Sequence, residues 1–224
     1  MDNNRTMHNL STIIKRLEAV VSRLEDLSVF NGPILPSTLT DSNSEAIQAF
    51  DDFIDSSVKQ YLHLSNRLGG LVAMQAAEVF KGFKEQRKFL SVTTQAAKPD
   101  PATLETLLGP TKDAIVAVTD IQKKNRFDGM YVHLTAVADG IRMLAWVNIH
   151  SRPFVYVEES LGSAHFFGNK ILKNQKEKDK LEVEWIKSYY QVCHGLVSYV
   201  KLHFPTGITW NARGGLAESV MGVS

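Results

Sequence analysis

Cysteine is almost absent from this sequence. Cys193 is the only one in 224 residues, so a framework of internal disulfides is excluded, and a reducing cytosol fits this usage. A chain of this length buries roughly 70% of its unfolded surface on folding, so it needs neither disulfides nor a metal to be stable. The length allows one large domain, or one domain with an additional segment.

Long apolar runs are missing as well. The first residues, MDNNRTMHNL, lack the apolar core of a secretory signal. No stretch approaches the ~20 apolar residues that a membrane-spanning helix needs. We therefore expect a cytoplasmic protein without a transmembrane segment. Excess charge is also absent: 25 Lys and Arg face 24 Asp and Glu, for a net charge of +1. Nucleic-acid binders usually carry a basic excess, so we expect no nucleic-acid partner.

Strand signals are also missing: no segment sustains period-two alternation, and no Asn-Gly hairpin turn lies between apolar runs. Apolar residues instead recur at three- and four-residue steps in six successive segments, which indicates amphipathic helices. Short connections between them predict an all-α fold, an antiparallel up-and-down six-helix bundle. The expected inward-facing residues are Ile47, Phe50, Ile54, Val58, Tyr61 and Leu62; Leu71, Met74, Phe80, Phe83 and Leu90; Leu104, Leu107, Leu108, Ile115, Val118 and Ile121; Met130, Leu134, Val137, Ile141 and Leu144; Phe154, Val157, Leu161, Ala164 and Ile171; and Leu181, Trp185, Tyr189, Val192, Leu196 and Val200.

Helix breakers divide the chain into four parts. Residues 1–28 carry a short coiled-coil helix, and 29–43 are a linker that contains Gly32, Pro33 and Pro36. The bundle spans 44–205, and Ser42-x-x-Glu45 is expected to cap its first helix. Residues 206–224 form a Gly-rich tail. We expect the tail to fray except for TGITWN, where Ile208 and Trp210 fold back onto the bundle end.

The segment IIKRLEAVVSRLED, residues 13–26, repeats Arg-Leu-Glu at a spacing of seven residues, the period of a helix that packs against another helix. With Leu10, Leu17 and Leu24 at d, Ile14 and Val21 fall at a. Ile13, Val20 and Leu27 then widen the apolar face at g, beyond what a dimer needs. A helix this short must associate to be stable in water. Its charged residues, Arg16, Glu18, Arg23 and Glu25, either keep it soluble or are recognised by a partner helix.

Catalytic and metal-binding patterns are not evident. His133 and His165 stand alone at helical positions, and His194 diverges from its neighbour Cys193. Glu158 and Glu159 diverge in the same way, so they do not form an acid/base pair. GSAHFFGNK, residues 162–170, fails the spacing and the context of a phosphate loop. We expect no enzyme, no cofactor and no metal site.

Lysines cluster near the last predicted turn of the bundle: Lys170, Lys173, Lys176, Lys178 and Lys180. Such a cluster is either a solvated loop or a surface that steers an acidic partner such as actin. A small-molecule or lipid site between the helices ranks low, because the apolar stripes contain no polar cluster to orient a ligand.

Several blocks together resemble the adenylyl cyclase-associated protein (CAP) family. Residues 13–25 match its opening signature, two aliphatic residues followed by two Arg-Leu-Glu triplets. LAWV (144–147), RPFVYVEES (152–160), FFGNKILK (166–173) and SYVKLHFPTGITWN (198–211) are similar to its N-terminal helical domain and occur in the same order. The resemblance covers nearly the whole chain but omits the family's proline-rich, actin-monomer-binding and C-terminal β parts.

The resemblance implies a non-enzymatic actin-regulatory and signalling scaffold at the cell cortex and the actin cytoskeleton. It implies that the N-terminal helix binds adenylyl cyclase and forms homo-oligomers, and that the bundle engages cofilin-decorated actin and promotes filament disassembly. A purely structural multimerisation module is the alternative. The candidate cyclase-binding and oligomerisation residues are Ile13, Ile14, Arg16, Leu17, Glu18, Val21, Arg23, Leu24 and Glu25. The candidate actin- and cofilin-binding residues are Asn169, Lys170 and Lys173.

Overall fold

The computed structural model describes residues 37–175 and 180–221, with side chains for 44–173 and 180–220. Over these residues the backbone is helical and contains no strand; a single isolated bridge joins Ala96 to Gly215. The all-α prediction is confirmed. None of the described helices is long and apolar enough to cross a membrane.

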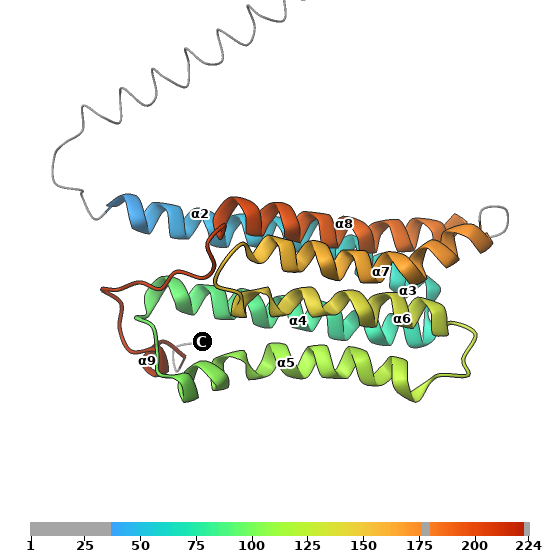
Figure 1. Ribbon diagram of the computed structural model, residues 1–224, viewed down its shortest axis with the longest axis horizontal. Coiled ribbons are helices and arrows are strands. Elements are labelled where there is room, and N and C mark those ends of the chain that lie inside the picture. The colour runs from blue at the N-terminus through green and yellow to red at the C-terminus, as the bar shows by residue number, and fades with distance from the viewer. Residues whose placement is uncertain (1–36, 176–179, 222–224) are drawn as a thin grey trace, which may run out of the picture. The chain divides into compact units, whose positions relative to one another are not determined.

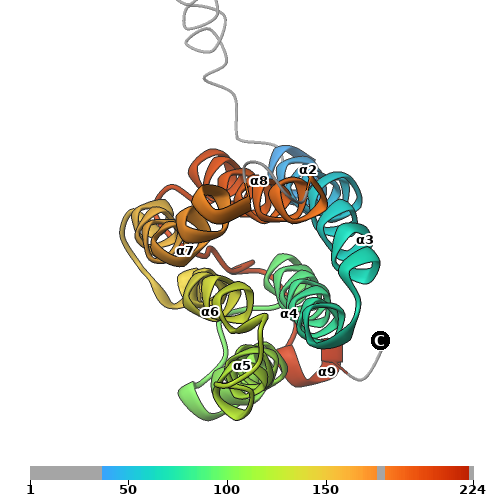
Figure 2. The ribbon, with the colours of Figure 1, turned by 90° about the vertical axis from the view of Figure 1, so that its right-hand side faces the viewer.

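Six helical rods run antiparallel to one another (Figure 1). The first and fourth rods are continuous across a change of helix type. The elements are α2 (Ser37–Phe53), the π-helical η1 (Ile54–Val58) and α3 (Lys59–Leu68); α4 (Gly70–Gln95); α5 (Pro101–Lys124); α6 (Tyr131–Gly140) and the 3-10 helix η2 (Ile141–Asn148); α7 (Pro153–Gln175); and α8 (Lys180–His203). A short last helix, α9 (Ala217–Met221), follows. Viewed end-on, α3, α8, α7, α6 and α4 surround the core, and α5 lies outside against α4 and α6 (Figure 2).

The expected stripes form most of the core. Its largest fully buried side chains include Trp146, Trp185, Tyr61, Tyr189 and Phe83. The prediction for the second helix was partly wrong. Met74 is 58% exposed and Leu71 is half-buried, because the buried stripe of α4 lies one residue further round the helix, at Val72, Ala76 and Val79.

The first helix begins earlier than predicted. α2 starts at Ser37, inside the expected linker 29–43, so Ser42 and Glu45 lie within the helix and do not cap it. Ser37 directly follows Pro36 in the sequence, and the small polar residues after it contain no Gly or Pro to stop a helix. Residues 29–36 lie outside the described part of the chain.

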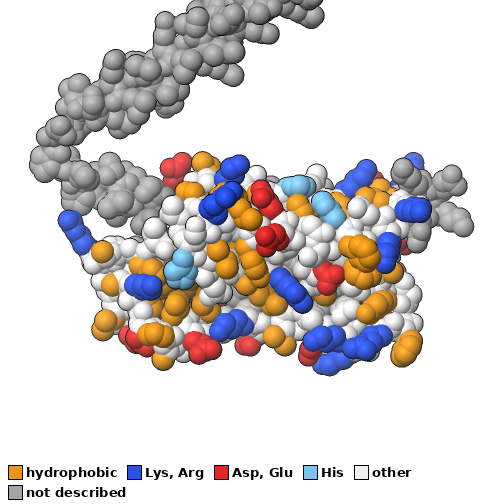
Figure 3. Space-filling view, in the orientation of Figure 1, with side chains coloured by type: hydrophobic (Ala, Val, Ile, Leu, Met, Phe, Trp, Pro, Cys, Tyr) orange, Lys and Arg blue, Asp and Glu red, His pale blue; other side chains and the backbone are white. Residues whose placement is uncertain are grey.

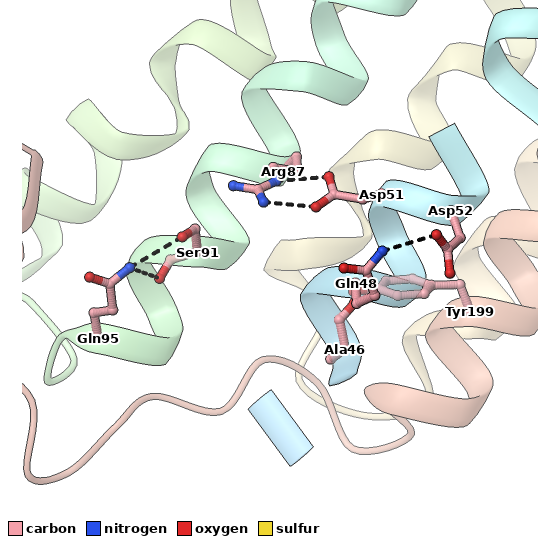
Figure 4. Close-up of polar contacts among 8 residues, drawn as sticks. All are labelled: Ala46, Gln48, Asp51, Asp52, Arg87, Ser91, Gln95 and Tyr199. Atoms are coloured by element: carbon pink, nitrogen blue, oxygen red, sulfur yellow. Dashed lines mark hydrogen bonds and ion pairs between the residues drawn. The ribbon is translucent and has the colours of Figure 1, made fainter. Parts of the chain in front are cut away.

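Polar contacts fasten α2 to the bundle (Figure 4). The guanidinium of Arg87 on α4 donates two hydrogen bonds, of 2.9 and 2.8 Å, to the carboxylate of Asp51. The Tyr199 hydroxyl on α8 donates to the backbone carbonyl of Ala46 at 3.1 Å. The same rod buries Phe50, whose ring lies 4.9 Å from that of Tyr199. The first rod is therefore part of the bundle from Ala46 onward.

The tail is ordered further than expected. Trp210 folds back, as predicted, and its ring packs edge-on against Phe89 at 5.9 Å. The backbone N–H of Asn211 donates to the carbonyls of Thr93 and Ala96 at the end of α4. Gly215 donates to Gln95, and α9 contacts α4. The expectation of fraying was wrong for residues 212–221, because the carbonyls that end α4 accept hydrogen bonds from this returning segment.

Candidate partner-binding surface

The N-terminal candidate residues lie outside the described part of the chain. These are Ile13, Ile14, Arg16, Leu17, Glu18, Val21, Arg23, Leu24 and Glu25. Lys176 and Lys178 of the lysine cluster also lie outside it. The structure therefore bears on the bundle candidates alone.

Asn169, Lys170 and Lys173 are all exposed near the C-terminal end of α7. The Lys170 ammonium lies 4.4 Å from the ring centroids of both Phe166 and Phe167. The two rings meet edge to face at 5.1 Å, and Phe166 is 64% exposed. A cation over aromatic rings contributes about 0.5–1 kcal/mol at an exposed site. The result is a small surface of aromatic rings with a cation held over them.

The sequence of α7 sets the direction of this surface. Pro153 occupies the start of the helix, where its missing N–H costs nothing. Val157, Ala164 and Ile171 are buried against the bundle, which leaves Phe166 and Lys170 on the outer side. Gly168 allows Tyr190 of α8 to approach, since a Cβ at Gly168 would overlap the Tyr190 hydroxyl. That close contact fixes α7 against α8 beside the candidate residues.

The candidate lysines are not neutralised within the described chain. Among the residues that the structure describes, no carboxylate lies within ion-pair distance of Lys170 or Lys173. Unpaired exposed cations leave a positive potential that attracts an acidic partner. The arrangement can bind an anionic surface, with the Phe166 ring adding apolar contact area.

The structure gives His133 a partner on another helix. The ring is buried on α6, and its Nε2 lies 3.0 Å from Glu182 Oε2 of α8. It also packs against Trp185, with ring centroids 5.2 Å apart. Burial lowers the pKa of His133, and the nearby Glu182 carboxylate opposes that effect. The two residues are 49 positions apart, and nothing in the local spacing signals their contact.

His165 and His194 also approach each other, with ring centroids 6.5 Å apart on α7 and α8. Burial and the neighbouring His194 both lower the pKa of His165. Within residues 37–175 and 180–221, no group of three His, Cys, Asp or Glu side chains is placed to hold a metal ion.

As predicted, His194 diverges from its neighbour Cys193, since the His194 side chain is exposed and the Cys193 side chain is buried. Burial raises the pKa of the Cys193 thiol to about 12, which keeps it protonated and a poor nucleophile.

A cavity of about 220 Å³ lies at the opposite end of the bundle, where the tail returns. Phe89, Leu104, Leu108, Ile208 and Trp210 supply its apolar lining, and Lys98 and His150 its polar lining. Sites for drug-sized ligands are typically 300–1,000 Å³. The cavity is below that range, so it adds little to the idea of a small-molecule binding bundle.

Comparison with known proteins identifies the chain. Residues 50–208 match the family model described as "CAP, N-terminal domain". Residues 11–49 match the model described as "CAP N-terminal conserved motif". This chain belongs to the CAP family. The match to the conserved motif includes the repeated Arg-Leu-Glu segment, and the match to the domain includes α7 with Asn169, Lys170 and Lys173.

Full-length relatives of this CAP-family chain are about twice as long. Human adenylyl cyclase-associated protein 2 is 34% identical over 224 residues, covering 97% of this chain and 47% of the relative. The adenylyl cyclase-associated protein of Schizosaccharomyces pombe is 31% identical over 265 residues, covering 93% of this chain and 48% of the relative. The chain therefore spans about half the length of the curated relatives it matches.

Solved structures share the fold. The N-terminal domain of the adenylyl cyclase-associated protein from Dictyostelium discoideum has a TM-score of 0.74 and 30% identity, covering 77% of this chain and 98% of that one. A crystal structure of the N-terminal domain of CAP that indicates variable oligomerisation has a TM-score of 0.76 and 30% identity, covering 79% and 95%. The six-rod bundle is thus the fold of CAP N-terminal domains.

Proposed function

We propose that this CAP-family chain is an actin-regulatory and signalling scaffold. Its N-terminal segment forms oligomers and binds adenylyl cyclase, and its helical bundle engages cofilin-decorated actin filaments and promotes their disassembly. The match to both CAP family models across residues 11–208 carries the proposal. Binding does not require a reaction centre, and the exposed cation–aromatic surface on α7 is suited to it.

The N-terminal part of the proposal rests on the heptad pattern. Leu17 and Leu24 supply the apolar seam, and the repeated Arg and Glu residues at positions 16, 18, 23 and 25 display charge beside it. The relatives are named for association with adenylyl cyclase. We assign oligomerisation to the apolar seam and cyclase recognition to the charged residues.

The bundle part of the proposal rests on α7. Asn169, Lys170 and Lys173 are exposed on one helix whose opposite side is buried, so a partner meets them on a rigid support. Lys170 and Lys173 have no ion-pair partner within the described residues. Actin is acidic, so both lysines contribute attraction to a filament at low salt.

A purely structural multimerisation module is the second candidate. The wide apolar face of the heptad segment favours it, as does the variable oligomerisation indicated for a related N-terminal domain. Under this alternative the bundle is a spacer and has no effect on actin by itself.

Single-filament microscopy separates the two candidates. The shortening rate of cofilin-decorated actin filaments is measured without protein, with the whole chain, and with a Leu17→Ala/Leu24→Ala variant that disrupts the seam. The scaffold predicts faster shortening with both proteins, and a lower concentration requirement for the whole chain because of multivalency. Filaments that shorten at the cofilin-only rate in every condition leave the multimerisation module as the surviving function.

A further inference from the structure

The turn between α5 and α6 exposes an aromatic side chain completely. Phe127 is 104% exposed, the most exposed of the large hydrophobic residues described. The turn itself is held by the backbone: Asp128 donates to the carbonyl of Asn125 at 3.1 Å, and Tyr131 donates to that of Asp128 at 3.0 Å. The Phe127 ring is therefore presented on a structured turn without being used in the core.

Basic residues flank this ring. Lys123, Lys124 and Arg126 are exposed within four positions of Phe127. Lys124 lies 3.4 Å from Asp120, and the Asp128 carboxylate accepts a hydrogen bond from the Met130 N–H at 2.8 Å. Lys123 and Arg126 have no ion-pair partner among the described residues. The turn is a positively charged tip with an apolar centre.

The charge extends across the whole end of the bundle. The end that faces the viewer in Figure 2 contains the α3–α4 turn, the α5–α6 turn, the end of α7 and the start of α8. Arg67 lies in the last turn of α3, and Lys173 and Lys180 lie near the facing ends of α7 and α8; all three are exposed. In the space-filling view, basic side chains gather at the lower right, over the end of α5 (Figure 3). We call the set Arg67, Lys123, Lys124, Arg126, Phe127 and Lys173 the basic end.

We propose that the basic end is a docking surface for an acidic protein surface with an apolar socket, into which Phe127 inserts, and that this acidic surface belongs to the cofilin-decorated filament. The inference rests on the proposed function and extends its α7 site, through Lys173, to the neighbouring turns. Charge complementarity carries the assignment: of the five exposed cations of the basic end, Lys124 alone has an ion-pair partner among the described residues, and three of the five lie within four positions of Phe127.

A protein partner fits this composition better than a bilayer. One exposed ring supplies little apolar area for insertion into lipid, whereas stable membrane attachment takes a larger apolar face or a second anchor. Protein hot spots, by contrast, are enriched in aromatic side chains and Arg, and Arg126 and Phe127 are neighbours on this turn. The rim charges are expected to speed encounter, and Phe127 to slow dissociation.

The test compares two variants of the whole chain. The end variant is Lys123→Glu/Arg126→Glu/Phe127→Ala. The matched control, at the opposite end, is Lys98→Glu/Arg213→Glu/Leu202→Ala; Leu202 is 75% exposed, and Lys98 and Arg213 are exposed. Each variant reverses two cations and truncates one exposed apolar side chain, so both have the same net charge. The single variant Phe127→Ala is included because it removes only solvent-exposed atoms and leaves the fold intact.

Two readouts are recorded with cofilin-decorated filaments: co-sedimentation for binding and microscopy for shortening. We expect the end variant to need at least tenfold more protein for half-saturation, and Phe127→Ala to need severalfold more, while the control matches the wild type. Binding that depends on the basic end without any shortening would leave this inference standing and remove the disassembly role. Equal filament binding by the end variant and the control would overturn the inference. So would an end variant that binds filaments as the control does and loses binding only to phosphatidylserine vesicles, measured by the same co-sedimentation.

Discussion

At the residue scale, the fold determines which protonation state of the His133 ring is favoured. Its ring is enclosed by α6 and α8, with Glu182 at Nε2 and Trp185 against its face. The other ring nitrogen, Nδ1, is buried without a hydrogen-bond partner in the described structure. A protonated ring would place an N–H donor there with no acceptor, so the neutral ring suits this site.

The stability of the bundle is therefore expected to fall in mild acid. Burial lowers the pKa of His133 from its ordinary 6.5, so below pH 6.5 the unfolded chain binds a proton more readily than the folded chain. The free energy of unfolding then rises with pH in this range, by at most about 1.4 kcal/mol per pH unit for one group. Urea unfolding of the wild type and of His133→Gln at pH 5.5 and 7.5 measures it.

The variant is expected to lose less stability between pH 7.5 and 5.5 than the wild type. His63→Gln, at an exposed position on α3, serves as the control and is expected to keep the wild-type pH dependence. An unchanged slope in His133→Gln would show that the acid sensitivity comes from other groups.

At the element scale, close approach of α7 and α8 depends on where glycine occurs. Gly162 and Gly168 both lie in α7, but only Gly168 faces another helix. A Cβ at Gly168 would overlap the Tyr190 hydroxyl and lie 2.9 Å from Ile186 Cδ1, whereas a Cβ at Gly162 would meet no atom within 4 Å. The same substitution therefore has opposite effects at two positions of one helix.

We expect Gly168→Ala to destabilise the bundle by about 1–3 kcal/mol through overpacking. Gly162→Ala is expected to stabilise it by about 0.5–1 kcal/mol, since alanine loses less backbone freedom in a helix. Chemical unfolding of both variants checks the pair. If Gly168→Ala proves as stable as Gly162→Ala, the close contact between α7 and Tyr190 is not present in solution.

Buried amides show which features of the elements could not be predicted. Gln86 of α4 donates a hydrogen bond to the Leu144 carbonyl at 2.7 Å and accepts one from the Trp146 indole at 3.0 Å. Both partners lie in the 3-10 helix η2. The period of the apolar residues predicted a helix there, and Leu144 is buried as expected. The buried hydrogen-bond partner of this 3-10 segment, Gln86, lies about 60 positions away, and the periodicity does not contain such a contact.

The same distinction separates predicted from missed boundaries. Pro101 and Pro153 start α5 and α7, and such starts can be predicted from the sequence, because proline fixes its own backbone angle and is tolerated in the first turn of a helix. The order of residues 212–221 was missed, because it comes from hydrogen bonds to the end of α4. Lys170 and Lys173 were chosen because they are polar positions in a block that resembles the family, but the cation over Phe166 and Phe167 and the exposure of Phe127 came from the structure.

At the scale of the whole molecule, the chain combines two parts with different requirements. The bundle from Ser42 onward is a compact unit with its own core, and it needs no partner to bury its apolar residues. The heptad segment, by contrast, is predicted to form a helix too short to be stable alone, with Leu17 and Leu24 on its apolar seam. Association should therefore depend on the segment, and thermal stability on the bundle.

Leu17→Ala/Leu24→Ala is expected to separate these two properties. Truncating both d-position leucines removes apolar area from the seam, so the molar mass from light scattering should fall towards the 25.0 kDa of one chain. The unfolding midpoint of the bundle should stay within about 1 °C at equal concentration, because the described core is built from residues of the bundle. Leu202→Ala, which truncates an exposed leucine of the bundle, is the control and should leave the mass unchanged. A double variant that keeps the wild-type mass would place the seam elsewhere in the chain and leave the heptad residues as a surface for adenylyl cyclase alone.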